Sequence, residues 1–329
     1  MMDEPVQSAI SADGVRAAAA RLSGVAVKTP LLENTILNER VGGRILLKAE
    51  VLQHYGSFKL RGAYNRLSQL TDNERKRGVV AWSSGNHAQG VAYAAKRLSI
   101  PATIIMPADA PRIKSDNVRA LGATIITYDR YAEDREEIGR SLADKHGMAL
   151  APSYDHPHII EGQGTVGLET SEQAAALGAP LDAMVICCGG GGLAAGCATI
   201  LKEVSPSTQL WIAEPEGYDE TWASIRDGAR AYADVSRPTI CDAIATPTPG
   251  ELTLPILQRT LAGGLTVTER EVAAAMRFAF QTLKLVLEPG GAVALAGLLS
   301  GHLDVKGRTV AVTLSGGNVD FDNFISITK

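Results

Sequence analysis

The sequence predicts an α/β protein in which mostly parallel sheets are flanked by helices. Short apolar runs alternate with helical patterns through most of the 329 residues, as crossover connections between parallel strands require. Polar or glycine-rich loops follow several of these apolar runs, and ligands bind at this end of the strands in open α/β sheets. The length suits one large domain or two medium ones.

A first series of strands is predicted in the N-terminal half. Residues 79–82, 102–106 and 124–127 are apolar runs typical of buried strands. Residues 88–98 and 112–121, which lie between these runs, have helical spacing. Strands separated by helices of this length indicate a parallel sheet.

A second series follows at residues 184–187, 210–213 and 310–314. A long amphipathic helix is predicted to begin at Thr268, because Thr268 and Glu271 fit a capping box. Its apolar face would carry Val272, Ala275, Met276, Ala279 and Leu283. The chain is therefore expected to form a second sheet with its own helices.

Two polar stretches, at residues 71–74 and 152–155, are the predicted crossings between two lobes. We therefore expect a large domain formed by residues 1–72 together with 153–329. Residues 73–152 would form a small domain.

Composition excludes several classes of function. The net charge is −4 and aromatic residues make up 5%, so neither a basic face nor a base-stacking platform is expected and nucleic acid is not a predicted partner. The acidic N-terminus has no secretory pattern, and no apolar run is long enough to span a bilayer.

The sequence contains four cysteines, Cys187, Cys188, Cys197 and Cys241. They show no C-x-x-C spacing, which predicts buried thiols in a cytoplasmic protein. The six histidines form no H-E-x-x-H pattern, and His156 and His158 are expected on a polar loop surface.

Lys59 is the first candidate catalytic residue. It follows the apolar strand candidate at 45–47 and opens a helical pattern next to Phe58. A lysine in the first helical turn beside an aromatic ring can lie in a pocket, where its amine loses its proton more easily and can form a Schiff base.

The loop formed by Ser83, Ser84, Gly85, Asn86 and His87 follows the strand at 79–82 and precedes a helix. Backbone N–H groups at a helix start can bind a carboxylate or a phosphate, and serine and asparagine side chains add donors. The loop is therefore either an anion site or a plain helix cap.

A second loop, Gly189, Gly190, Gly191 and Gly192, follows the strand at 184–187 and leads into a helix at 193–204. Consecutive small residues allow a backbone to wrap an anion, and phosphate is the natural occupant. No Gly-Lys-Ser/Thr follows, so a nucleoside-triphosphate loop is excluded.

Two further loops end strands. Glu214 and Glu220 flank a carbonyl-rich turn that can hold a hard divalent cation, or that can be a solvated acidic loop. Ser315 ends the last strand, where its hydroxyl can bond an aromatic ring nitrogen or close a turn.

Taken in order, these motifs resemble those of the fold type II pyridoxal-phosphate (PLP) enzymes, the tryptophan synthase β-like fold, and in particular the serine/threonine dehydratase and serine racemase group. The matching segments are residues 57–63, 83–87, 189–193, 288–289 and 315–318. The likeness extends from about residue 29 to residue 320 with the motifs in family order.

The resemblance implies a role for each motif. Lys59 would bind PLP covalently and act as the base at the substrate Cα. The remaining cofactor contacts would come from Phe58 against the ring, Asn86 at the ring hydroxyl, Gly189 to Gly192 with Leu193 at the phosphate, Glu288, and Ser315 at the ring nitrogen. The loop from Ser83 to His87 would bind the substrate carboxylate, with Ser84 as the opposite-face acid or base of the racemases.

By the same resemblance, Glu214, the Tyr218 carbonyl and Glu220 match a divalent-cation site for Mg²⁺, Mn²⁺ or Ca²⁺. Glu220 stands where aspartate is commoner in the family. The large domain would bind PLP, the small domain would clamp the substrate, and the enzyme would be a homodimer. Because the chain ends soon after residue 318, no regulatory domain and no feedback by isoleucine are expected.

The implied activity is β-elimination from a β-hydroxy L-amino acid to a 2-oxo acid and ammonia, with L-threonine or L-serine as the first choice of substrate. An alternative is 3-hydroxyaspartate, if Arg135 binds a second carboxylate rather than lying exposed on its helix. A second alternative is serine racemase, which would use Lys59 and Ser84 on opposite faces. β-Replacement synthases and a PLP-binding sensor without turnover rank below these.

Overall fold

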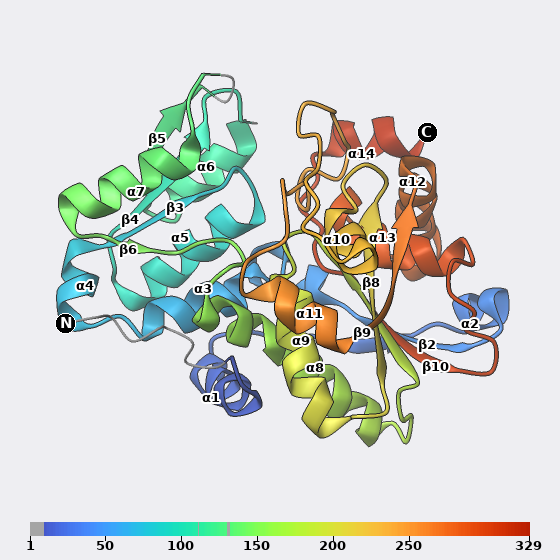
Figure 1. The fold of residues 1–329 in the computed structure, drawn as a ribbon. Coiled ribbons are helices and arrows are strands. Elements are labelled where there is room, and N and C mark those ends of the chain that lie inside the picture. Colours follow the sequence, from blue (N-terminus) through green and yellow to red (C-terminus); the bar gives the residue numbers. More distant parts are fainter. Residues whose placement is uncertain (1–9, 111, 130–131) are drawn as a thin grey trace.

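Two sheets organise the chain into two lobes (Figure 1). The computed structural model describes residues 10–110, 112–129 and 132–329. One sheet has six strands in the order β1-β2-β10-β7-β8-β9, parallel except for the antiparallel edge strand β1, and the other has four parallel strands in the order β5-β4-β3-β6. The predicted α/β fold of fold type II is confirmed. The strands are Leu31–Glu33 (β1), Arg44–Lys48 (β2), Val79–Trp82 (β3), Ala102–Pro107 (β4), Thr124–Tyr128 (β5), Ala149–Leu150 (β6), Ala183–Cys187 (β7), Gln209–Pro215 (β8), Leu261–Val267 (β9) and Thr309–Thr313 (β10).

Helices cover both faces of the six-stranded sheet. Alternate residues of β2 face opposite ways: Ile45 and Leu47 pack with α12 and α13, whereas Leu46 packs with α1, α8 and α9. The sheet is therefore buried on both sides, as parallel sheets are. The helices of this lobe are Ala12–Leu22 (α1), Thr35–Val41 (α2), Pro157–Ala176 (α8), Gly192–Val204 (α9), Glu220–Asp227 (α10), Thr253–Thr260 (α11), Glu269–Phe278 (α12), Pro289–Leu299 (α13) and Phe321–Thr328 (α14), with short 3-10 turns at Glu50–Leu52 (η1) and His54–Gly56 (η2).

The four-stranded sheet is covered in the same way. One face packs against α3 and α5, through residues such as Leu60 and Val91, and the other packs against α7 through Trp82 and Ala143. The strands lie between Val79 and Leu150, and the domain limits at 73 and 152 stay a prediction. The helices are Lys59–Ser68 (α3), Asp72–Arg77 (α4), Asn86–Leu98 (α5), Arg112–Ala120 (α6) and Arg135–His146 (α7).

The helix predicted at Thr268 is present as α12, and both halves of its capping box form between Thr268 and Glu271. After Phe278 the helix changes to a π-helical turn, Ala279–Leu283 (η3). Leu283 is therefore only partly buried, although Val272 and Met276 lie in the core as expected.

Three local predictions were incomplete. Residues 71–74 are not only a crossing, because Thr71 and Glu74 form a second capping box that starts α4. His156 does not lie on a loop surface: its ring Nδ1 accepts a hydrogen bond from the His158 backbone N–H and caps α8.

Strand β9 was missed because it contains Gly263 and Gly264, and glycine does not favour strands. The rings of Trp211 and Trp222 occupy the space that Cβ atoms on these two glycines would need.

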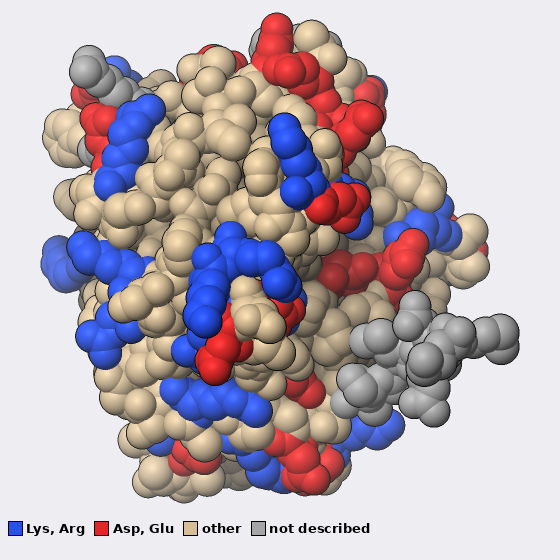
Figure 2. All heavy atoms as spheres, turned by 90° about the vertical axis from the view of Figure 1, so that its left-hand side faces the viewer, with Lys and Arg blue, Asp and Glu red and all other residues tan. Residues whose placement is uncertain are grey.

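The helices, the cysteines and the surface charges can be compared with the composition of the chain. In the described part of the chain, every helix is too short or too polar to cross a bilayer. The four cysteines are buried and free. Figure 2 shows positive and negative side chains on a largely uncharged face, with several of the positive ones gathered toward its left and centre.

Candidate active site

One cavity between the two lobes brings the predicted residues together. The four-stranded lobe contributes the ends of β3, α5 and α7, and the six-stranded lobe contributes the loops after β7 and β10 and the start of α13. The predicted residues that line it are Phe58, Lys59, Ser83, Ser84, Gly85, Asn86, His87, Arg135, Gly189, Gly190, Gly191, Gly192, Leu193, Glu288 and Ser315.

Lys59 is the first residue of α3, and its side chain is partly buried. Its Nζ donates a hydrogen bond to the Ser153 carbonyl oxygen at 3.1 Å and lies 5.2 Å from the centre of the Phe58 ring. Burial lowers the pKa of Lys59 to about 8, and the nearby Glu288 carboxylate partly opposes this. About a tenth of Lys59 is therefore a neutral, nucleophilic amine at pH 7, far more than for a lysine with the ordinary pKa.

The start of α3 is tied to the end of β10. Ser57 forms an isolated antiparallel bridge with Gly316, and the Phe58 N–H donates to the Ser315 carbonyl oxygen at 3.3 Å. These bonds hold Lys59 and Ser315 at the same end of the cavity even though they are far apart in the sequence.

Asn86 joins the two lobes. Its Nδ2 donates to Glu288 Oε1 at 2.5 Å, and its Oδ1 accepts from Asn318 Nδ2 at 2.7 Å. Asn318 also donates to the Tyr55 carbonyl oxygen at 2.7 Å. Asn86 is thus held from both sides, with its side chain fixed at the cavity wall.

The loop from Ser83 to His87 forms the N-terminus of α5. Ser83 Oγ accepts from the Gly85 N–H at 3.2 Å, and Asn86 is the first helical residue. His87 Nε2 lies 2.7 Å from the Ala151 carbonyl oxygen, which can only accept, so Nε2 carries the proton. Burial, and next the positive charge of Lys59, lower the pKa of His87 to about 3. His87 is therefore neutral, and any anion at this loop would be bound by backbone N–H groups and hydroxyls.

The glycine loop is fixed by its carbonyl oxygens. Gly189 O accepts from Thr221 Oγ1 at 2.9 Å, and Gly190 O accepts from the Gly250 N–H at 3.1 Å and from Thr253 Oγ1 at 2.7 Å. Gly191 is the N-cap of α9 with φ of 89°, a left-handed conformation that favours glycine. With its carbonyls bonded to the protein behind it, the loop can turn its N–H groups to an anion at the helix start.

The acidic pair lies behind the glycine loop and does not line the cavity. Glu214, at the end of β8, accepts from the backbone N–H groups of Thr221 at 3.3 Å and Trp222 at 2.8 Å. Glu220, at the start of α10, accepts from Thr246 Oγ1 at 2.6 Å, while its Oε2 is buried with no partner among the described residues. The solvated-loop alternative is wrong, because these two carboxyls are 0% and 3% exposed.

Burial raises the pKa of Glu214 well above its ordinary value, and the charge of Glu220 raises it further. Burial also raises the pKa of Glu220 to about 7. Tyr218 lies on the turn between them, and its hydroxyl donates to the Arg237 carbonyl oxygen at 2.7 Å. No group of three or more His, Cys, Asp or Glu side chains in the described residues is arranged for a metal. A cation here would therefore need the backbone carbonyl as well as the two carboxylates.

Sequence reasoning missed several residues of the cavity. Tyr154 packs against Gly190 and Gly192, and a Cβ at Gly190 would lie 2.4 Å from its ring. The segment from Asp242 to Thr246 forms another part of the wall. Tyr154 lies within the polar stretch at residues 152–155 that was predicted as a crossing between lobes, whereas residues 242–246 carry no motif that would have revealed them.

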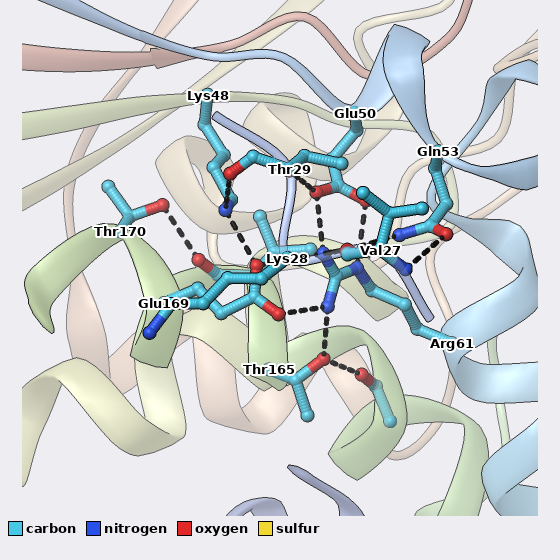
Figure 3. A network of polar contacts seen from close by, with 12 residues as sticks. Val27, Lys28, Thr29, Lys48, Glu50, Gln53, Arg61, Thr165, Glu169 and Thr170 are labelled. Atoms are coloured by element: carbon cyan, nitrogen blue, oxygen red, sulfur yellow. Dashed lines mark hydrogen bonds and ion pairs between the residues drawn. The ribbon is translucent and has the colours of Figure 1, made fainter. Parts of the chain in front are cut away.

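A buried charge network supports the helix that carries Lys59 (Figure 3). Arg61, two residues further along α3, donates to both Glu50 oxygens at 2.8 Å and to Glu169 at 2.7 and 2.9 Å. Lys48 Nζ donates to Glu169 at 2.6 Å and to the Thr29 carbonyl oxygen at 2.8 Å. Two cations and two anions thus balance, and they fix the first turn of α3 against β2 and α8.

An amine of lowered pKa and a glycine loop suited to an anion line the same cavity between two parallel-sheet lobes, an arrangement typical of enzymes that bind a phosphorylated aldehyde cofactor. The comparison with known families agrees. The model described as "Pyridoxal-phosphate dependent enzyme" matches residues 22–316, so the chain belongs to this family and its cofactor is PLP.

Proteins with similar sequences indicate the class of reaction. An L-threo-3-hydroxyaspartate ammonia-lyase of Pseudomonas sp is 44% identical over 312 residues, 95% of this chain and 96% of that protein. The L-threonine ammonia-lyase of Thermotoga maritima is 40% identical over 311 residues, 94% of this chain and 76% of that protein. The solved serine racemase of Dictyostelium discoideum is 35% identical with a TM-score of 0.87, covering 95% of this chain and 100% of that one. The chain is therefore a lyase of the PLP-dependent β-elimination class.

Proposed function

We propose that the substrate is 3-hydroxyaspartate, which the enzyme converts to oxaloacetate and ammonia. One observation carries this choice over threonine and serine: Arg135, at the start of α7, lines the same cavity as Lys59 and the loop from Ser83 to His87. A guanidinium pairs well with a carboxylate, and threonine and serine have no second carboxylate to offer it. The 44% identical relative named for this substrate supports the choice.

The chain's own groups fit the two ends of such a substrate. The N-terminus of α5, with Ser83, Ser84 and Asn86, would bind the α-carboxylate, and Arg135 would bind the carboxylate beyond Cβ. A dicarboxylate held at both ends has little rotational freedom, which places its Cα proton and β-hydroxyl reproducibly.

We further propose that Lys59 binds PLP covalently and then removes the Cα proton. Gly189 to Gly192 with Leu193 would hold the phosphate, Phe58 the ring face, Asn86 the ring hydroxyl and Ser315 the ring nitrogen, with Glu288 fixing Asn86. When bound to the substrate amine, PLP withdraws electrons from Cα, which acidifies its proton and lets the β-hydroxyl leave. Serine is a neutral partner for the ring nitrogen, which suits elimination more than a long-lived carbanion.

The test compares kcat/KM of the holoenzyme for L-threo-3-hydroxyaspartate, L-threonine and L-serine, with the 2-oxo acid as readout. We expect the dicarboxylate to be preferred, and Arg135→Ala to lower its kcat/KM by about tenfold or more, the value of a hydrogen bond to a charged group. Threonine turnover should change little. Arg140→Ala is the matched control, because Arg140 is exposed on the same helix and is not among the described residues that line the cavity. A wild-type preference for threonine would refute the proposal.

Racemisation is the second candidate, because Ser84 lines the cavity together with Lys59. A hydroxyl on the opposite face of Cα can return a proton there and invert the centre. The same assays with a D-serine readout address it: Ser84→Ala should abolish any D-serine formation while elimination from L-substrates continues.

We also propose a divalent cation, Mg²⁺, Mn²⁺ or Ca²⁺, bound by Glu214, Glu220 and the Tyr218 carbonyl. The unpartnered Glu220 Oε2 and the raised pKa values of both carboxyls are what a cation would relieve. Oxygen donors of this kind are the ligands that hard cations prefer.

A homodimer is the proposed assembly. Leu52, Tyr55 and Val286 are 47%, 40% and 44% exposed, although large apolar side chains are usually buried. The segments that carry them meet at Gly317, whose N–H donates to the Gly56 carbonyl oxygen. Light scattering on the holoenzyme would measure the mass of the assembly.

A further inference from the structure

Helix α7 packs on the four-stranded sheet with Gly139 in close contact with Trp82. A Cβ at Gly139 would lie 2.4 and 2.7 Å from two atoms of the indole ring, and 3.3 Å from Ile105 Cδ1. Real Cβ atoms do not approach a ring this closely, so only glycine permits α7 to lie where it does. Trp82 is the last residue of β3 and pairs in register with Ile105 on β4.

The indole ring cannot move aside easily. Trp82 is 7% exposed and packs in a cluster with Val80, Ile105, Tyr128 and Ala143. Interiors packed to this extent transmit a displacement rather than absorb it. Bulk added at Gly139 would therefore push α7 away from the sheet.

The same helix carries Arg135 one turn before Gly139. Asp134 caps its first turn, with Oδ1 accepting from the Glu136 N–H at 2.7 Å and from the Glu137 N–H at 3.4 Å. Residues four apart lie on the same face of a helix, so Arg135 stands above Gly139. Trp82 and Arg135 both line the cavity. The position of α7 on Trp82 thus fixes where the base of the Arg135 side chain stands at the cavity.

We propose that Trp82 and Gly139 are positioning residues that set the reach of Arg135 and thereby the selectivity for a ligand with two carboxylates. The inference rests on the proposed function for its substrate class. A hydrogen bond weakens steeply beyond about 3.2 Å, so a helix displaced by an ångström would lose the guanidinium–carboxylate pair. The proposed α-carboxylate site at α5 directly follows Trp82, but its backbone is tied to the sheet, since the Ser83 N–H donates to the Ile105 carbonyl oxygen at 3.1 Å. A displacement of α7 would therefore leave this site in place.

The experiment measures binding of two unreactive probes to the holoenzyme by calorimetry: succinate, with two carboxylates, and butyrate, in which a methyl group replaces one of them. The ratio of their dissociation constants reports the second carboxylate alone. It is measured for the wild type, Arg135→Ala, Gly139→Ala, Trp82→Phe and the double variant Gly139→Ala/Trp82→Phe. Ala143→Gly is the matched control, because it weakens the same helix one turn further on without adding bulk against the ring.

We expect Gly139→Ala to reduce the preference for succinate about tenfold, as Arg135→Ala does, with butyrate binding unchanged. The double variant should recover at least part of the preference, because phenylalanine lacks the second ring, and Ala143→Gly should retain it. Equal loss for both probes, full retention in Gly139→Ala, no recovery in the double variant, or no preference for succinate in the wild type would each overturn the inference. Failure of the proposed function appears separately, as absent turnover of 3-hydroxyaspartate with the succinate preference intact.

Discussion

At the scale of single residues, the chemistry depends on how burial changes Lys59. The partly buried amine loses solvation, which disfavours its charged form, while Glu288 favours that form. Glu288 is itself held in place by Asn86, so the environment of the amine is set by groups from both lobes. His87 adds no competing base, because burial keeps it neutral.

The first prediction concerns the pH at which Lys59 loses its proton. In the cofactor-free protein, the rate at which an amine-specific reagent modifies Lys59 should rise with pH through a midpoint of about 8, since only the neutral amine reacts. Glu288→Gln should move the midpoint to lower pH, because it removes a carboxylate that favours the charged amine. Mass spectrometry of the digest gives the rate, and peptides with exposed lysines normalise it. A midpoint above about 10, where an unperturbed lysine titrates, would contradict the prediction.

At the scale of elements, the first turns of three helices at the cavity, α3, α5 and α9, are positioned by different means. α3 begins with Lys59 and is fixed by the Arg61 network, α5 begins at the loop after β3, and α9 begins at Gly191. The N-terminal turns of α5 and α9 offer N–H groups that their helices leave unbonded. In the function we propose, a substrate carboxylate would bind at the first of these turns and the cofactor phosphate at the second.

A second prediction concerns the glycine loop. Gly190→Ala places a methyl group 2.4 Å from the Tyr154 ring, and the loop cannot retreat because Gly250 and Thr253 hold the Gly190 carbonyl oxygen. The N–H groups that we propose bind the phosphate should shift, and PLP affinity should fall by about tenfold or more. Fluorescence titration of the cofactor-free enzyme measures this. Adding Tyr154→Ala should restore binding in part, and unchanged affinity in the single variant would show that the loop does not contact the phosphate.

At the scale of the whole molecule, the cavity exists only because the lobes meet. The four-stranded sheet brings the loop from Ser83 to His87 and Arg135, and the six-stranded sheet brings the glycine loop, Ser315 and Glu288. The acidic pair is linked to this cavity from behind: α10 supplies Thr221, which holds the Gly189 carbonyl oxygen, and Thr246 of the cavity wall donates to Glu220.

A third prediction follows from this link. Removing divalent cations with EDTA should lower the melting temperature of the holoenzyme and weaken PLP binding, because Glu214 and Glu220 would then be buried next to α10 without a cation to offset their desolvation and mutual repulsion. Mg²⁺, Mn²⁺ or Ca²⁺ should reverse both effects. Glu220→Gln removes one of the charges and should abolish the response to cations. If the wild type melts at the same temperature with EDTA and with each cation, the proposed site is wrong.

Much of this architecture was predictable from sequence, and the failures have physical causes. The strands of both central series were predicted because buried parallel strands are continuous apolar runs, as in β3 and β7. Strand β9 was not, because Gly263 and Gly264 make room for two tryptophans from elsewhere in the lobe. The burial of Glu214 and Glu220 could not be predicted either, because most carboxyl groups are exposed and the sequence does not show which residues surround them.

The sequence by itself determined the parallel α/β fold and the order of the motifs, because apolar periodicity and glycine spacing are local properties of a chain, and it predicted Lys59 as the amine that binds the cofactor. Only the tertiary structure showed that Arg135 lines the same cavity as Lys59, that Asn86 joins the lobes through Glu288, and that Gly139 makes room for Trp82. These relations depend on distances between segments far apart in the chain. Tertiary packing sets those distances, and no local pattern of residues predicts them.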